Sequence, residues 1–281
     1  MSQTERMNPL DQVISSSYTG EKEVAELRSS FDNAQPCRHL VLPNFLDSAL
    51  ANELYEHFPA IDSLNVKRKS LNEDKSEDYH FERWHPSFSK LREVISSQDF
   101  AQWMSDVTGI EGLHTTDDSL GSGVHQGKDG SYVDVHIDVN MNPDKGLWRR
   151  INLLIYLNRE WKAEYGGDLE LWDKDMSRCE VKVPCDFNRA VIFYTDENSP
   201  HGYSKIHLPE GETRKSFYTY FYTPIGEGFR YSDSRFVSRP DDALGKRMLT
   251  QIKESVKINA KRILKNLGVQ SLDFQDKNKK S

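Results

Sequence analysis

Short stretches of alternating hydrophobic and polar residues follow one another from residue 113 to residue 223, and this pattern constrains the fold more than any other feature. Residues 132–136 alternate strictly, whereas residues 151–157 are almost wholly apolar, as in a strand that is buried on both faces. Turn residues such as Gly166-Gly167 and Asn142-Pro143 separate these stretches. Many short strands at this spacing predict a β-sandwich or barrel rather than a parallel α/β sheet.

Helical periodicity flanks the β-rich segment on both sides. Helices are expected over residues 21–31, 48–57, 87–96, 99–108 and 240–270. Asp47 is the predicted N-cap of the second helix, because its carboxylate can accept the free N–H groups of a first helical turn. Residues 1–35 are expected to be loosely ordered apart from their helix, and residues 36–235 to form the main domain.

The expected C-terminal helix is amphipathic. Its apolar residues recur at intervals of three and four, at Leu249, Ile252, Val256, Ala260, Ile263 and Leu267. We expect this apolar stripe to pack on the domain, with a dimer contact as the alternative. Residues 60–85 are very polar and are expected to form a mobile surface loop, either a lid over a binding site or a simple solvated loop.

Composition excludes several classes of protein. The chain has 281 residues, a net charge of −7 and three scattered cysteines, which argues against a disulfide framework and favours a reducing cytoplasm. No apolar run approaches the length of a membrane span, and the first residues lack the hydrophobic core of a secretory signal. The acidic charge argues against general nucleic-acid binding. From Lys246 onward, ten basic and three acidic residues give a net charge of +7, so the rest of the chain carries −14. We interpret this basic end as a solvated helix face. Contact with a phosphate-bearing partner is the alternative.

A candidate metal site begins with His136 and Asp138. Residues two apart on a strand point to the same side, so this imidazole and this carboxylate can face one ion. His201, after a later strand, can complete a set of two histidines and one carboxylate, which is typical of non-haem Fe(II) oxygenases. His207 is a weaker third candidate, because it lies in a loop. A zinc hydrolase could use the same three ligands, although no general base is evident beside them.

Arg214 and Ser216 are candidates for binding a carboxylate. They stand two residues apart at the start of the last predicted strand and therefore share a face. A guanidinium group suits a carboxylate because its N–H donors form a bidentate fork. An arginine at the start of a strand is by itself also a common surface residue.

The sequence around these residues resembles the prolyl 4-hydroxylase-like branch of the 2-oxoglutarate/Fe(II) oxygenases. The shared features are Tyr156-Leu157-Asn158 with Trp161, then Gly166-Gly167-Asp168-Leu169, then the distal histidine and the cation on the last strand. The resemblance covers about residues 123–223. It implies a mainly β fold, with a double-stranded β-helix (jelly-roll) core at about residues 113–223 and helices at both ends.

The resemblance also implies roles for individual residues. His136, Asp138 and His201 would bind the iron, and Arg214 would hold the distal carboxylate of 2-oxoglutarate with help from Ser216. Tyr156 falls where the family places a tyrosine that contacts this cosubstrate, although it could be an ordinary sheet aromatic.

Two further positions depend on the resemblance. Arg149 matches a substrate-contacting position, with Arg150 beside it as the alternative. The family often has a second tyrosine facing the cosubstrate before the H-x-D motif, and here His125 or Gln126 would have to take its place.

The expected activity is that of a 2-oxoglutarate- and Fe(II)-dependent dioxygenase that hydroxylates an unactivated C–H bond. Such an enzyme consumes O2, releases succinate and CO2, and takes ascorbate as a candidate reductant. The substrate would be a peptidyl proline, another protein residue or a free small molecule. Besides the zinc hydrolase, the alternative is a jelly-roll binding protein without catalysis.

Overall fold

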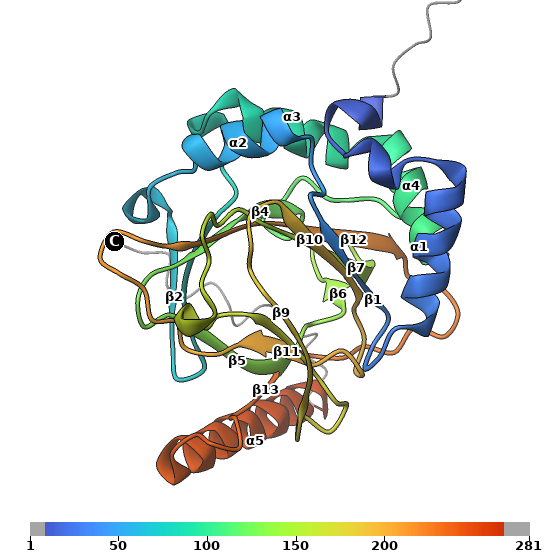
Figure 1. Cartoon of the computed structure of the whole chain (residues 1–281). Helices are drawn as coiled ribbons and strands as arrows, with labels where there is room; N and C mark the ends of the chain where they lie inside the picture. The colour runs from blue at the N-terminus through green and yellow to red at the C-terminus, as the bar shows by residue number, and fades with distance from the viewer. Residues whose placement is uncertain (1–8, 267–281) are drawn as a thin grey trace, which may run out of the picture.

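Thirteen strands form one continuous antiparallel sheet that curls into two facing layers in the computed structural model, which describes residues 9–266 (Figure 1). The first layer has the order β1 (His39–Pro43), β10 (Arg189–Tyr194), β7 (Leu147–Tyr156), β12 (Arg214–Pro224) and β4 (Ser122–Gly127). The second has the order β5 (Tyr132–Ile137), β11 (His201–Tyr203), β8 (Leu169–Trp172) and β9 (Cys179–Val183). Two short strands, β6 (Met141–Asn142) and β13 (Arg235–Val237), pair with β7 and β5. The predicted mainly β, jelly-roll architecture is confirmed.

Strand β7 shows why this sequence forms a strand buried on both sides. Ile151, Leu153 and Ile155 alternate along it and join the main hydrophobic core, each with no exposed surface. The residues between them, including Asn152 and Tyr156, point to the opposite face, toward the interior between the layers. The almost continuous apolar character of β7 therefore reflects its burial on both faces.

Four helices cover the outer face of the first layer (Figure 1). They are α1 (Glu21–Asn33), α2 (Ser48–Glu56), α3 (Pro86–Ile95) and α4 (Gln98–Thr108). The Asp47 carboxylate accepts the N–H groups of Ala49 and Leu50, which confirms the predicted N-cap. Fully buried side chains such as Phe88 and Phe100 join the helices to the sheet, and burial of each contributes about 1.5–3 kcal/mol.

The N-terminal segment is more ordered than expected over its described part. Short 3-10 turns at η1 (Pro9–Gln12) and η2 (Ser16–Tyr18) precede α1. Val13 and Ile14 are fully buried, and Ile14 forms a β-bridge with Leu46. These apolar contacts anchor the segment to the domain, whereas residues 1–8 lie outside the described part.

The expected surface loop over residues 60–85 is wrong in its central part. Strands β2 (Val66–Lys69) and β3 (Glu73–Asp78) form an antiparallel hairpin there. Strand β3 pairs with β4 along one part of its length and with β5 along another, and so joins the two layers. The backbone groups of β3 form hydrogen bonds with the neighbouring strands. Its polar side chains are tolerated because they face a polar interior rather than a hydrophobic core.

Helix α5 (Leu244–Asn266) lies apart from the other helices, beside β13 (Figure 1). Its polar face makes the contacts: Lys246 donates to the buried Asp134 at 2.8 Å, and Thr250 is 2% exposed. Leu249, Ile252 and Val256 of the apolar stripe are 56%, 56% and 61% exposed, so the expectation that they dock on the sheet is wrong. Buried polar groups on the barrel select the polar face of the helix; the side chains of Ala260, Ile263 and Leu267 lie outside the described part. None of the helices in residues 9–266 has the length and apolar character that a membrane span requires.

Candidate active site

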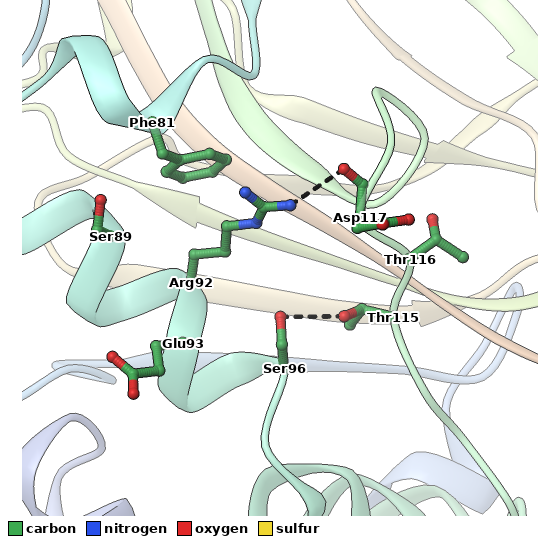
Figure 2. Close-up of a pocket in the computed structure, with 8 residues that line it drawn as sticks. All are labelled: Phe81, Ser89, Arg92, Glu93, Ser96, Thr115, Thr116 and Asp117. Atoms are coloured by element: carbon green, nitrogen blue, oxygen red, sulfur yellow. Dashed lines mark hydrogen bonds between the residues drawn. The ribbon is translucent and has the colours of Figure 1, made fainter.

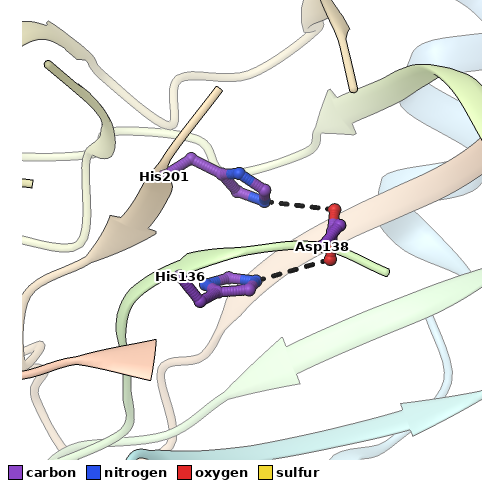
Figure 3. Close-up of side chains that lie close together, drawn as sticks. All are labelled: His136, Asp138 and His201. Carbon is purple, nitrogen blue, oxygen red and sulfur yellow. Dashed lines mark ion pairs between the residues drawn. The ribbon is translucent and has the colours of Figure 1, made fainter. Parts of the chain in front are cut away.

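The two histidines of the predicted metal site lie directly opposite each other on neighbouring strands. His136 of β5 is paired with His201 of β11, and their ring centroids are 4.4 Å apart. Opposed residues of an antiparallel pair share one face of the sheet, and Asp138 returns to that face two residues after His136. One ligand atom from each of the three residues lies within 4.8 Å of the others (Figure 3). The structure thus brings the three predicted ligands together, whereas His207 is not part of the group.

The histidine tautomers are those that a metal requires. Nδ1 of His136 bonds to the carbonyl oxygen of Asp134 at 3.0 Å, and Nδ1 of His201 bonds to that of Ser199 at 3.0 Å. A carbonyl only accepts, so each Nδ1 carries a proton and Nε2 is the ring atom that remains to bind a metal. Burial, with the neighbouring His136, lowers the pKa of His201 to about 4, so its ring is neutral at neutral pH. Two imidazoles and one carboxylate that converge on one point fit a divalent metal.

The Asp138 carboxylate is held by two donors. Its Oδ2 accepts from Arg149 Nη2 at 2.8 Å and from Asn152 Nδ2 at 2.9 Å. Asn152 Oδ1 in turn accepts from Arg149 Nε at 2.8 Å and from Thr195 Oγ1 at 3.0 Å. Burial opposes ionisation of Asp138, but Arg149 and the two histidines outweigh it and hold the pKa of Asp138 well below its usual range. This network fixes the carboxylate toward the histidines and keeps it charged.

Asn152 was not among the predicted site residues. It is a 2% exposed amide within the apolar residues of β7, and this polar interruption is the clue that the sequence contained. Arg149, predicted as a substrate contact, donates to Asp138 and Asn152, and its guanidinium lies 3.5 Å from the Tyr220 ring centroid; the substrate contact stays a prediction. Arg150 points elsewhere, toward Thr223 and the Trp148 ring.

Arg214 is a buried cation that forms no ion pair within 4.0 Å with a carboxylate of the described residues. The residue is 5% exposed, and its Nε donates to the Gly167 carbonyl at 2.8 Å and contacts Cys185 Sγ at 3.2 Å. Its guanidinium lies 4.1 Å from the Tyr203 ring centroid, and no carboxylate of residues 9–266 pairs with it. A buried charge is costly unless it is paired, so this arginine is suited to an anionic ligand.

The predicted neighbours of Arg214 lie beside it. Ser216 is directly opposite Tyr156 on one side and His125 on the other. Arg214 Nη2 donates to the Tyr156 hydroxyl at 3.4 Å. The structure also separates the two candidates before the H-x-D motif: His125 stacks on Tyr218 in the interior, whereas Gln126 donates to the Pro59 carbonyl.

Apolar side chains line the part of the interior beside His201 and Tyr156. Phe193 is fully buried and packs edge-on against the His201 ring, with 4.8 Å between centroids. Tyr156, Leu169 and Leu171 belong to the same hydrophobic cluster as Phe193. Such a lining limits the access of water to the metal ligands on this side.

A separate surface pocket of about 420 Å³ lies between α3 and residues 115–117 (Figure 2). Arg92 crosses it, donating to the Asp117 carbonyl at 3.1 Å with its guanidinium 4.9 Å from the Phe81 ring centroid. Ser96 and Thr115 close one side through a hydroxyl bond of 3.1 Å. None of the predicted site residues lines this pocket, so it is no part of the metal site.

Residues 122–222 match the sequence model of a family described as the 2OG-Fe(II) oxygenase superfamily. The curated relatives include prolyl 3-hydroxylase OGFOD1 of Mus musculus, which is 29% identical over 195 residues, 67% of this chain and 33% of the relative. The same protein of Xenopus laevis is 28% identical, over 66% of this chain and 35% of the relative. The chain therefore spans about a third of the length of these relatives.

Solved structures show the same fold. A prolyl hydroxylase from Trichoplax adhaerens, in complex with a hypoxia inducible factor peptide fragment, matches with a TM-score of 0.51 and 19% identity, over 73% of this chain and 95% of that one. HygX from Streptomyces hygroscopicus, with nickel and 2-oxoglutarate bound, matches with a TM-score of 0.50 and 12% identity, over 74% and 97%. At these identities the likeness concerns the fold.

Proposed function

We propose that this chain belongs to the 2OG-Fe(II) oxygenase superfamily, whose sequence model matches residues 122–222, and we infer its activity from this family. It is a 2-oxoglutarate-dependent dioxygenase that hydroxylates a C–H bond of its substrate. One observation carries this proposal. A group of two histidines and one carboxylate lies in the same interior as a buried arginine that has no ion pair among residues 9–266. The first suits Fe(II), and the second suits the distal carboxylate of 2-oxoglutarate.

His136, Asp138 and His201 would hold the iron. The backbone carbonyls at Asp134 and Ser199 engage the two Nδ1 atoms, so the Nε2 atoms are the ones that would bind the ion. Arg149 and Asn152 occupy Oδ2 of Asp138, which leaves Oδ1 as the less encumbered ligand atom. With only three protein ligands, a bound ion would keep further coordination positions for the cosubstrate and O2.

Arg214 would hold the distal carboxylate of 2-oxoglutarate. Its Nε is already engaged by the Gly167 carbonyl, so the η nitrogens are the donors available to the ligand. The Tyr156 hydroxyl and Ser216 lie beside them and can donate to the same carboxylate. Iron and 2-oxoglutarate, once bound, supply the oxidative chemistry in which O2 yields succinate, CO2 and a hydroxylated product.

We propose a peptidyl proline as the substrate, because the curated relatives are named prolyl 3-hydroxylases. The sequence resembles the prolyl 4-hydroxylase-like branch, so the ring carbon that receives the hydroxyl group has to be read from the product. A cytoplasmic location remains the prediction made from the few scattered cysteines.

A mixture of proline-centred pentapeptides tests this function. The protein is incubated with Fe(II), 2-oxoglutarate, O2 and ascorbate, and the peptides are analysed for the gain of one oxygen atom and for the hydroxyproline isomer. We expect hydroxylated proline with the wild-type protein and none with His201→Ala. Hydrolysis supported by zinc without 2-oxoglutarate would instead favour the hydrolase, and ligand binding without turnover would favour a binding protein.

A further inference from the structure

Strand β3 presents an inward-facing row of charged residues that the proposed reaction does not use. Glu73, Lys75 and Glu77 alternate along β3 and therefore share one face. Glu77 is paired with His125 of β4, whose ring stacks on Tyr218 at 4.2 Å. This face of β3 thus continues the wall that contains the candidate second cosubstrate contact.

The row is connected to the metal ligands through side-chain contacts. Tyr218 lies 5.0 Å from Tyr220, ring to ring, and Tyr220 lies under the guanidinium of Arg149 at 3.5 Å. Arg149 in turn donates to Asp138. Lys75 and the metal ligands therefore belong to one interior, on walls joined by the two tyrosines.

Glu77 is shared unequally by three partners. Its Oε1 receives the guanidinium of Arg68 at 2.6 Å, whereas its Oε2 is 3.4 Å from Lys75 Nζ and 3.5 Å from His125 Nε2. Burial opposes ionisation of Glu77, but Lys75, His125 and Arg68 outweigh it and hold the pKa of Glu77 well below its usual range. Burial and Lys75 lower the pKa of His125 to about 4, so His125 is neutral at neutral pH. Two cations thus share one carboxylate.

Of the two cations that share Glu77, the Lys75 ammonium has the weaker contact with this carboxylate. Its side chain is 18% exposed, and among residues 9–266 it donates no hydrogen bond, although an ammonium carries three donors. Glu73 also acts on the charge of Lys75, but no ion pair within 4.0 Å joins them. A charged group held in an interior with free donors is suited to an anionic ligand.

We propose that Lys75 is a second carboxylate-binding residue of this cavity, separate from Arg214, and this inference rests on the proposed function. A single ammonium beside the Glu77 carboxylate matches a singly charged carboxylate and disfavours a doubly charged phosphate. That carboxylate belongs either to the iron-proximal end of 2-oxoglutarate or to an acidic side chain beside the target proline.

The first arm of the test measures cosubstrate binding without turnover. Calorimetry gives the affinity of Mn(II)-loaded protein for N-oxalylglycine in the wild type, Lys75→Met and Lys69→Met. Lys69 is the matched control, a lysine of the same hairpin that is 83% exposed. If the carboxylate is that of the cosubstrate, Lys75→Met weakens binding about tenfold or more, Lys69→Met does not, and Lys75→Arg restores it.

The second arm measures substrate selection with the proline-centred peptide mixture. If the carboxylate is that of the substrate, wild-type products are enriched in Asp or Glu at one flanking position. Lys75→Met loses this enrichment, and Lys75→Glu favours Lys or Arg there. Equal thermal midpoints for all variants show that the fold is intact.

The proposal is overturned if Lys75→Met has the wild-type affinity for N-oxalylglycine and the wild-type peptide preference. If the wild type hydroxylates no peptide, a wild-type affinity of Lys75→Met for N-oxalylglycine is enough to overturn it. Failure of the proposed function looks different, since the wild-type protein would then not bind N-oxalylglycine at all. A loss that Lys69→Met shares equally also overturns the proposal, because it would reflect the charge of the hairpin rather than the cavity.

Discussion

Replacing Arg214 by methionine should remove the anchor for 2-oxoglutarate while preserving the fold. The side chain is 5% exposed, so methionine keeps much of its buried volume. The Gly167 carbonyl, which loses the Arg214 Nε–H, still accepts from Cys185 Sγ at 2.8 Å. Among the described residues Arg214 forms no ion pair within 4.0 Å, and the Asp168 carboxylate, which its charge also stabilises, is only partly buried. The main loss should therefore be in ligand binding.

The size of this loss follows from the donors that face the ligand. Two charge-assisted hydrogen bonds from the η nitrogens contribute about 1.5–2 kcal/mol each, or about 3–4 kcal/mol together. Every 1.4 kcal/mol is about tenfold in affinity, so binding should weaken roughly 100- to 1,000-fold. Arg214→Lys keeps the charge but not the bidentate fork and should lose about tenfold.

Calorimetry with Mn(II)-loaded protein measures this loss, and a second ligand provides the control. 2-Oxobutyrate carries the metal-binding 2-oxo acid end but no distal carboxylate. Its affinity should be the same for the wild type and Arg214→Met. The reasoning is refuted if Arg214→Met binds 2-oxoglutarate as tightly as the wild type does, or if both ligands weaken in parallel.

Three further variants test other parts of the site. Asn152→Ala removes a donor to Asp138 and should lower Mn(II) affinity roughly 10- to 100-fold in calorimetry; an unchanged affinity would show that Asp138 needs no such support. In the metal-free protein, His125 alone should contribute up to about 3 kcal/mol to the stability that is lost as the pH falls from 6.5 to 4, because its pKa is about 4 in the fold while the unfolded chain takes up the proton near pH 6.5. Urea unfolding at several pH values should show a smaller loss for His125→Asn, and equal pH dependence would contradict this. Gly202→Ala would place a Cβ 2.7 Å from the Val133 carbonyl oxygen and push β11 away from β5. Thermal unfolding should show a loss of about 2 kcal/mol or more in the free energy of unfolding. Gly226→Ala, which has open space around it, should leave the stability unchanged.

Sequence reasoning succeeded where backbone geometry alone decides which way a side chain points. His136 and Asp138 are two apart in a strand region, so their common direction follows from the strand period. The third ligand could be predicted only as a histidine later in the sequence. Its position opposite His136 depends on the pairing of β11 with β5, which the sequence does not reveal. The same holds for Ser216 and Tyr156, which strand pairing places opposite each other.

Sequence reasoning failed where polar residues face a polar interior. Lys75 and Glu77 lie on a strand, but their face of β3 lacks the apolar alternation that identifies a strand, so the segment was expected to be a loop. Asn152 lies in an apolar strand, where one polar residue is easily overlooked. For α5, periodicity revealed an apolar face, but the contacts of Lys246 with Asp134 determine which face docks, and no periodicity encodes them.

Succinate formation tests the central claim most directly. Wild-type protein and His136→Ala are incubated with Fe(II), O2, ascorbate and 2-oxoglutarate, and succinate is quantified by mass spectrometry against a metal-free blank. If His136, Asp138 and His201 hold the iron, the wild-type protein forms succinate in a 2-oxoglutarate-dependent manner and His136→Ala stays at the blank. Equal succinate formation by the two proteins would contradict the assignment of the metal site.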